Sequence, residues 1–300
     1  MRISHPAGKI LVGVDFSESS SQALLEAGRI AGEEDPLIEV VHIIDEDLLS
    51  DIREYSQLEE AEIVSSIEER LKVFCREAGL VDRKLSRLVR IGHPVRAFSS
   101  LCDEIEPDLL VLGAWCQYRN DSELMGVTAR QILQESKSDV LLVRDRKGNQ
   151  VHHVVACVDF SAYDSAVVRA AEVVCRAERA SLDILHVFYP PWLSELSIDG
   201  ENGEAFEDLE REYRALLQGR LDKLVPREKS LVDSIEVQTI AKQFPRHCEG
   251  ILGHIKESGA DLAVIGARGR SRIESMILGR IAERIVMNSS SSVYVVKNLP

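Results

Sequence analysis

The sequence lacks a long apolar run, a cysteine pair and a surplus of basic side chains. No window approaches about 18 uninterrupted apolar residues, the length that predicts a membrane span. Residues 1–6 run directly into an apolar segment and contain no signal-peptide core. The six cysteines include no Cys-x-x-Cys pair, which favours reduced thiols. These absences predict a soluble, cytoplasmic protein.

Basic side chains are in the minority. The chain has 36 Lys and Arg against 50 Asp and Glu, a formal net charge of −14. A nucleic-acid partner needs a basic face that neutralises phosphates, so this composition argues against one. At 300 residues the chain is long enough for two domains of ordinary size, each with its own core.

What the sequence contains instead is a duplication. The tetrapeptide Val-Asp-Phe-Ser at 14–17 returns at 158–161, an offset of 144 (158 − 14). His42 returns as His186 at the same offset (186 − 42). Repetition over such a distance indicates two whole domains rather than a solenoid, whose units run to about 20–50 residues.

The offset between the copies grows further along the chain. Residues 107–114 match 260–267, an offset of 153 (260 − 107). We therefore predict one insertion of nine residues in the second copy. Its predicted place is the loop at 189–203, because prolines and glycines there are typical of a surface loop.

Each copy alternates β-branched apolar runs with segments of helical periodicity, which is typical of βαβ units around a parallel sheet. We predict an α/β protein of two domains, residues 1–148 and 149–300. Each is expected to be flavodoxin-like (Rossmann-like), with a five-stranded parallel sheet in strand order 3-2-1-4-5 and helices on both faces. In the first copy the predicted strands are 9–15, 37–44, 86–91, 109–113 and 139–144.

Aspartates and glycines stand where the predicted strands end. Asp15 and Asp159 each end a first strand, and Gly113 and Gly266 each end a fourth. In the order 3-2-1-4-5 these strands are neighbours at the point where the order reverses, where open parallel sheets bind ligands. We therefore expect each aspartate to face the glycine loop of its own copy. The alternative is that both aspartates only cap the helices that follow.

The second copy carries the features of an anion site. Gly266 and Gly269 allow a tight turn with exposed backbone N–H groups. Gly279 precedes a predicted helix whose N-terminus attracts phosphate. Positive charge gathers there, at Arg268, Arg270, Arg272 and Arg280. The pattern is neither a Walker A loop nor the Gly-x-Gly-x-x-Gly of dinucleotide folds; the alternative is a plain strand-to-helix turn.

On these residues the chain resembles a tandem universal stress protein of the UspA family over both repeats. ATP-binding members carry Gly-x2-Gly-x9-Gly-Ser/Thr after the fourth strand, and Gly266, Gly269 and Gly279 match its spacing. The resemblance implies that Asp159 contacts adenine and that a backbone group of Val187 meets the base. The site predicted for the second domain comprises Asp159, Ser161, Val187, Gly266, Arg268, Gly269, Gly279 and Arg280.

Departures from the family motif bear on the function. Arg280 replaces the hydroxyl residue that contacts phosphate, and its guanidinium can either pair with phosphates or fill their site. In the first copy Cys116 replaces the second glycine, in a turn expected to need φ > 0, and Val127 replaces the hydroxyl residue. We expect the first domain to bind nucleotide weakly or not at all.

The resemblance implies a cytoplasmic stress-response protein that binds an adenine nucleotide in its second domain as a sensor. The nucleotide is ATP, or else AMP or ADP, with or without Mg²⁺. The alternative is a nucleotide-independent scaffold whose sites have decayed. No base, nucleophile or metal-ligand set is identifiable, so we predict no enzyme, with weak ATP hydrolysis left open. His42 and His186 are predicted to be structural.

The resemblance also implies how the two domains associate. The last strands, 140–143 and 293–296, are expected to pair, as in a covalent pseudo-dimer. Such pairing would cover two apolar strand edges. Whether two chains form a homodimer, and which protein is the partner, the sequence leaves open.

Overall fold

The computed structural model describes residues 8–31, 37–56, 58–80, 85–114, 126–144, 150–190, 192–195, 203–225, 235–269 and 278–298. The chain divides into two compact units. Unit 1 consists of Met1–Gln150 together with Ser292–Asn298, and unit 2 is built from Val151–Ser291. No helix in the described part of the chain is long and apolar enough to cross a membrane.

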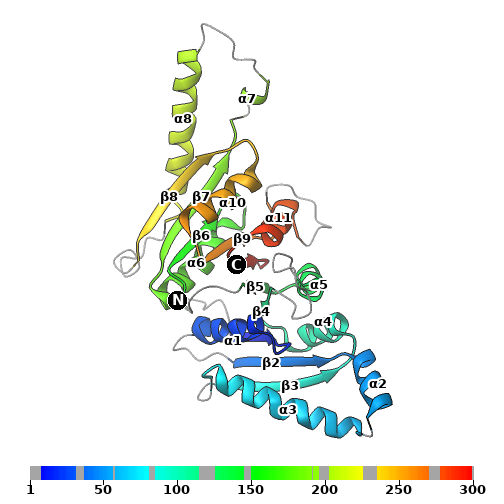
Figure 1. Ribbon diagram of the computed structural model, residues 1–300. Helices are drawn as coiled ribbons and strands as arrows, with labels where there is room; N and C mark the ends of the chain where they lie inside the picture. The colour runs from blue at the N-terminus through cyan, green and yellow to red at the C-terminus, as the bar shows by residue number, and fades with distance from the viewer. Residues whose placement is uncertain are drawn as a thin grey trace. The chain divides into compact units, whose positions relative to one another are not determined.

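Unit 1 contains a sheet in the order β3-β2-β1-β4-β5-β10 (Figure 1). The strands are β1 (Lys9–Gly13), β2 (Leu37–Ile44), β3 (Leu85–Ile91), β4 (Leu109–Gly113), β5 (Asp139–Val143) and β10 (Ser292–Val296). The first five are parallel, so the predicted order 3-2-1-4-5 is confirmed in this domain. Its helices are α1 (Glu18–Ala31), α2 (Glu46–Tyr55), α3 (Glu60–Glu77), α4 (Pro94–Ile105) and α5 (Val127–Glu135).

Unit 2 contains four parallel strands in the order β8-β7-β6-β9, which corresponds to β3-β2-β1-β4 of unit 1 (Figure 1). Its strands are β6 (His153–Cys157), β7 (Ser181–Phe188), β8 (Val237–Gln243) and β9 (Leu262–Gly266). Its helices are α6 (Asp164–Glu178), α7 (Trp192–Glu195), α8 (Gly203–Leu221), α10 (His247–Ser258) and α11 (Arg280–Asn288). The strands β6 and β9 are neighbours, so the loops at their carboxyl ends meet.

The fourth strand of each unit is buried at four of its five residues, which explains the continuously apolar runs Leu-Leu-Val-Leu in β4 and Leu-Ala-Val-Ile in β9. All five residues of β5 are buried, and so are all five of β10. The strand β10 runs antiparallel to β5, with Tyr294 opposite Leu141. This is the pairing that the family resemblance predicts for the last strands. It covers the edge of β5, which would otherwise be an apolar strand with unpaired backbone groups.

The prediction of one nine-residue insertion is wrong. Ile38 pairs with Leu85, and its repeat equivalent Leu182 pairs with Val237, so the offset at the third strand is already 152 (237 − 85). Eight residues (152 − 144) therefore enter before β8, and one more enters between β8 and β9. The offsets between repeated motifs give only the total number of inserted residues. The strand register is needed to show how many residues are inserted at each place.

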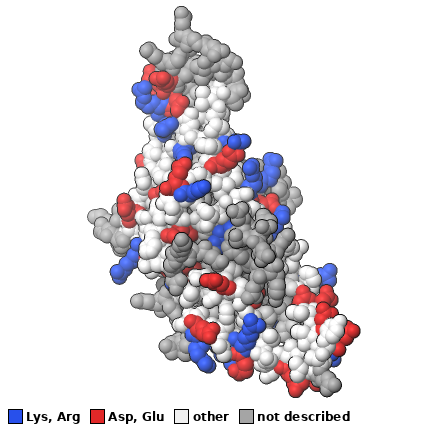
Figure 2. All heavy atoms as spheres, in the orientation of Figure 1, with Lys and Arg blue, Asp and Glu red and all other residues white. Residues whose placement is uncertain are grey.

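Acidic and basic side chains are interspersed on the face drawn in Figure 2, without an extended basic area among the described residues. The lack of an extended basic area on this face agrees with the formal net charge of −14. It offers no electrostatic footprint for a nucleic-acid backbone on that face.

Candidate functional site

The loop after β6 is folded by its own side chains. The carboxylate of Asp159 accepts a hydrogen bond from the backbone N–H of Ser161, Oδ1 to N 3.2 Å. The hydroxyl of Ser161 in turn accepts one from the N–H of Tyr163, at 3.3 Å. These are Asx and Ser turns, in which a short polar side chain imitates a backbone turn. The helix that follows, α6, has Tyr163 as its N-cap and no side-chain capping hydrogen bond, so the alternative that Asp159 caps this helix is wrong. The two turns instead fix the direction of the Asp159 carboxylate.

The loop after β9 lies directly against the loop after β6. A Cβ atom added at Gly266 would lie 2.9 Å from the Cβ of Tyr163. A Cβ added at Gly269 would lie 2.6 Å from Oδ2 of Asp159. Both distances are shorter than real Cβ atoms tolerate, so the two glycines permit a close approach of backbone to the aspartate loop. The expectation that Asp159 faces the glycine loop of its own copy is confirmed.

The reason for these glycines is the close approach and not a left-handed backbone. Positive φ occurs at three described glycines, Gly79, Gly92 and Gly259, and neither Gly266 nor Gly269 is among them. Gly269 therefore lacks the φ > 0 that was expected of the equivalent turn in the first copy. Its counterpart Cys116, for which the strain was predicted, lies outside the described residues.

The third glycine of the motif lies beside the same two loops, and we call the place where Asp159, Gly269 and Gly279 come together the crevice. Gly279 is the N-cap of α11, and its N–H donates to the carbonyl of Ala267 over 2.7 Å. A Cβ added at Gly279 would lie 3.8 Å from the Cα of Arg268. Arg280 is exposed at the first position of α11. A helix N-terminus with glycine as its cap offers its first N–H groups to an anion.

Not every predicted residue can be tied to this crevice. Val187 is buried in β7, and its Cγ1 lies 2.7 Å from where a Cβ of Gly250 would stand, so its side chain packs on α10. Only its backbone remains for a ligand, as the family resemblance implies. Arg270 and Arg272 lie outside the described residues.

Asp164 is a charged group of this region that is absent from the predicted site. Its side chain is 5% exposed, and Oδ1 accepts a hydrogen bond from the N–H of Asp159 over 3.2 Å. Burial raises the pKa of Asp164 to about 6, and the negative charge of Asp159 also raises it, against hydrogen bonds from backbone N–H groups of 159–161. The signal was present in the repeat, because the equivalent residue of unit 1 is Ser20 (20 + 144).

The raised pKa of Asp164 predicts a pH dependence of stability. A carboxyl group whose folded pKa lies above its unfolded value stabilises the fold below the unfolded pKa and loses that contribution as pH rises through the folded pKa. Between pH 4 and 7 the free energy of unfolding of the wild type should fall by about 2 kcal/mol relative to Asp164→Asn, since each pKa unit corresponds to about 1.4 kcal/mol. Denaturant unfolding at both pH values measures this difference.

Asp208→Asn serves as the control for that measurement, because the Asp208 side chain is 66% exposed. The control should keep the wild-type pH profile. An Asp164→Asn variant with the wild-type profile would show that Asp164 titrates normally in the fold.

The corresponding residues of unit 1 form the same aspartate turn but pack differently around the glycine. Asp15 accepts hydrogen bonds from both the N–H and the hydroxyl of Ser17. A Cβ added at Gly113 would lie 2.4 Å from the hydroxyl oxygen of Ser19, so α1 packs closely on this glycine. Val127 is 60% exposed and brings no hydrogen-bonding side chain to the start of α5. Weak or absent binding in the first domain stays a prediction.

The repeated histidines make the same structural contact. Nδ1 of His186 lies 2.8 Å from the carbonyl oxygen of Val158, and Nδ1 of His42 lies 2.8 Å from that of Val14. Burial lowers the pKa of His42, against the hydrogen bond to Val14 and the charge of Asp15. Each histidine thus ties the end of a second strand to the residue before the motif aspartate.

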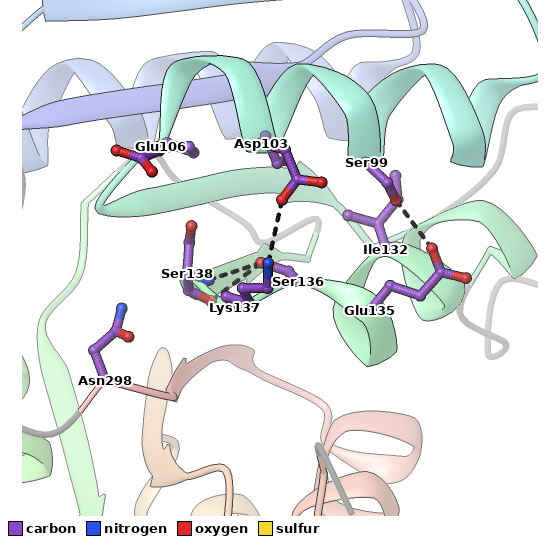
Figure 3. A pocket seen from close by; sticks show the side chains of 11 residues that line it. Ser99, Asp103, Glu106, Ile132, Glu135, Ser136, Lys137, Ser138 and Asn298 are labelled. Atoms are coloured by element: carbon purple, nitrogen blue, oxygen red, sulfur yellow. Dashed lines mark hydrogen bonds and ion pairs between the residues drawn. The ribbon is translucent and has the colours of Figure 1, made fainter.

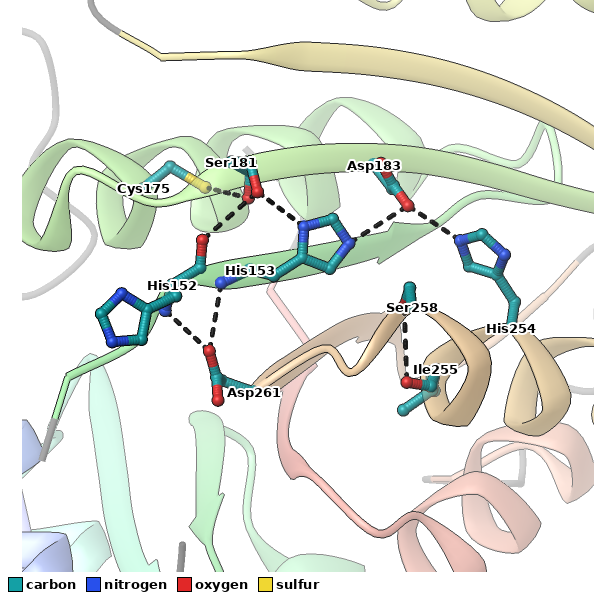
Figure 4. Close-up of polar contacts among 9 residues, drawn as sticks. All are labelled: His152, His153, Cys175, Ser181, Asp183, His254, Ile255, Ser258 and Asp261. Carbon is teal, nitrogen blue, oxygen red and sulfur yellow. Dashed lines mark hydrogen bonds and ion pairs between the residues drawn. The ribbon is translucent and has the colours of Figure 1, made fainter. Parts of the chain in front are cut away.

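A second polar cluster lies in unit 2 on β6, β7 and α10 (Figure 4). Oδ2 of Asp183 is 3.2 Å from Nε2 of His153 and 2.8 Å from Nε2 of His254. Although burial raises it, hydrogen bonds from the two histidines bring the pKa of Asp183 down to about 2. The hydrogen bond to Asp183 raises the pKa of His153. In the described part of the chain no three His, Cys, Asp or Glu side chains are placed to hold a metal ion.

Unit 1 does not repeat this cluster. Glu39 occupies the place of Asp183 (39 + 144), and its Oε2 is buried without a hydrogen-bond partner among the described residues. The place of His254 is taken by Leu101 (254 − 153). The cluster therefore belongs to the packing of unit 2, away from the motif loops.

A cavity of about 450 Å³ lies in unit 1, near the C-terminal ends of α4 and α5 (Figure 3). Lys137 pairs there with Asp103 over 3.3 Å, and Ser99 donates to Glu135 over 2.9 Å. The cavity lies where β5 begins, at the opposite end of the strands from Asp15 and Gly113. No predicted site residue lines it.

Comparison with known proteins shows which family the chain matches. The model of the universal stress protein family matches the chain twice, at residues 7–144 and 150–297. The universal stress protein YxiE of Bacillus subtilis (strain 168) is 27% identical over 152 residues, 48% of this chain and 97% of that protein.

Solved structures resemble the whole chain. A universal stress protein from Archaeoglobus fulgidus DSM 4304 has a TM-score of 0.59 at 19% identity, over 97% of this chain and 98% of its own. A putative universal stress protein from Pseudomonas aeruginosa UCBPP-PA14 has a TM-score of 0.64 at 14% identity, over 97% and 94%. At such identities the likeness establishes the fold.

Proposed function

The chain belongs to the universal stress protein family, with two family domains in tandem, and from this premise we propose that its second domain binds an adenine nucleotide. The observation that carries the proposal is the approach of Gly269 to Asp159, where a Cβ would lie 2.6 Å from Oδ2. This close approach brings the backbone N–H groups of the glycine loop and the Asp159 carboxylate next to each other, so that one ligand can contact both.

The two ends of the crevice have opposite character, which suits a nucleotide. At one end the Asp159 carboxylate can accept a hydrogen bond from the exocyclic amine of adenine, a group that guanine lacks at that position. At the other end, Gly279 begins α11, with Arg268 and Arg280 beside it. A helix N-terminus and guanidinium groups favour phosphate. The acidic Asp164 near Asp159 favours the base at that end over phosphate.

In this proposal the protein is a sensor and not an enzyme. Nucleotide would favour one conformation of the chain over another and so alter its contact with a protein partner. The free cysteines of the described residues suit a reducing cytoplasm, where we place the protein. A nucleotide-independent scaffold is the second candidate, favoured by the exposed Val127 that stands at the motif position in unit 1.

Calorimetric titration of the nucleotide-stripped protein with ATP, ADP and AMP, with and without Mg²⁺, tests the proposal. We expect one site, lost in Asp159→Ala and kept in Asp15→Ala. Absence of both heat and thermal shift at millimolar ATP would reject the sensor and leave the scaffold. Two sites would contradict the assignment of the first domain.

A further inference from the structure

The residue next to the motif aspartate has an unusual backbone in both units. Phe16 and Phe160 have φ of 63° and 61°. The other described non-glycine residues with positive φ are Glu106 and Arg179, which end α4 and α6 in the usual left-handed cap. A bulky aromatic residue outside a helix C-terminus adopts this conformation only when its surroundings hold it there.

Two side chains contact the ring of Phe160. The ring of His186 is one of them, with centroids 4.3 Å apart. The guanidinium carbon of Arg220, in the last turn of α8, lies 3.7 Å from the Phe160 centroid. His186 is itself fixed by its contact with the carbonyl of Val158. We call Phe160, His186 and Arg220 the aromatic clamp.

Unit 1 contains the same clamp. Phe16 lies 4.5 Å from the ring of His42 and 4.1 Å from the guanidinium carbon of Arg70. The phenylalanines and histidines are offset by 144, but the arginines are offset by 150 (220 − 70). The contact therefore exists in both units although the connecting segments differ in length, which indicates that the left-handed turn needs it.

The clamp decides where the Asp159 carboxylate points. The reversal at Phe160 brings the N–H of Ser161 back onto Oδ1 of Asp159 at 3.2 Å. That contact leaves Oδ2 directed at Gly269. Without the left-handed residue the chain would continue away from the crevice and the Asx turn would open.

We propose that Phe160, His186 and Arg220 are positioning residues that aim the Asp159 carboxylate at the base of the nucleotide. The inference rests on the proposed function of the second domain. It adds α8, through Arg220, to the elements on which recognition of the base depends.

Substitutions at Phe160 separate the ring from the backbone. Asparagine tolerates the left-handed conformation but cannot stack, whereas tyrosine keeps the ring. Calorimetry with ATP and GTP gives the readout, because a carboxylate aimed at the base accepts from the amine of adenine and opposes the carbonyl of guanine. We expect Phe160→Asn to lower the preference for ATP over GTP about 10-fold. Phe160→Tyr should keep the preference of the wild type. Phe16→Asn, the matched change in unit 1, should leave it unchanged.

Each outcome decides the matter. A wild type that binds no nucleotide rejects the proposed function and the clamp with it. A wild type that binds ATP, with an unchanged preference in Phe160→Asn, rejects the clamp alone. Equal losses for ATP and GTP would mean general damage and would also reject positioning. If Phe160→Asn does not fold, Arg220→Met removes one side of the clamp, and the same ratio decides.

Discussion

Replacing Gly269 by valine is expected to weaken ATP binding about 100-fold, equivalent to about 2.7 kcal/mol. The first atom of any side chain at this position would lie 2.6 Å from Oδ2 of Asp159, and the branches of valine would extend further. The carboxylate must then turn away from the base, and the glycine-loop backbone must retreat from the crevice. Titration calorimetry measures the change in dissociation constant.

Graded controls accompany this prediction. Gly279→Ala should weaken binding less, because its Cβ would lie 3.3 Å from the carbonyl of Ala267, a contact that a small shift relieves. Gly253→Ala, on α10, should leave binding unchanged, since its Cβ meets only the end of the Glu257 side chain at 3.7 Å. Equal affinity of Gly269→Val and the wild type for ATP would show that the nucleotide does not bind in the crevice.

The largest loss of stability is expected from Asp139→Ala. Oδ1 of Asp139 accepts hydrogen bonds from the N–H groups of Lys297 and Asn298, at 2.8 and 3.0 Å, and Oδ2 from the hydroxyl of Tyr294 at 3.2 Å. Burial raises the pKa of Asp139 although all three bonds lower it. Removing the carboxylate leaves three donors without their acceptor, at a cost of about 3 kcal/mol in free energy of unfolding.

Chemical denaturation of matched variants measures this loss. Asp139→Asn keeps an acceptor oxygen for the two N–H groups and should lose less than Asp139→Ala. Asp103→Ala is the surface control, because the side chains of Asp103 and Lys137 are 74% and 90% exposed and such pairs contribute little. Equal stability of Asp139→Ala and Asp103→Ala would show that Asp139 does not hold the end of the chain on β5.

The glycine motif shows how far spacing alone can go. The intervals among Gly266, Gly269 and Gly279 predicted a loop facing Asp159, because strand order places the first and fourth strands side by side. The spacing does not show why glycine is needed, because a left-handed backbone and a close approach of another group both select glycine. The packing of Gly269 against Asp159 decides between them.

Residues missed by the sequence analysis share one property. Arg220 contacts Phe160, which lies 60 residues away in the sequence (220 − 160), and Asp164 lies in an ordinary helical pattern, so no spacing rule selects either residue. Asp164 was visible only as a departure from Ser20 of the other copy. Arg220 corresponds to Arg70 in position only because each contacts the phenylalanine ring of its own unit, which the sequence does not show.

The sequence by itself determined the duplication, the α/β class, the strand order of the first domain and the family, because these follow from periodicity and from intervals along the chain. Only the tertiary structure decided how the insertions divide, why the motif glycines are glycine and what holds Phe160 in a left-handed conformation. Those features depend on distances between segments that are remote in sequence. Such distances are set by packing, in which many side chains act together and no single interval records the result.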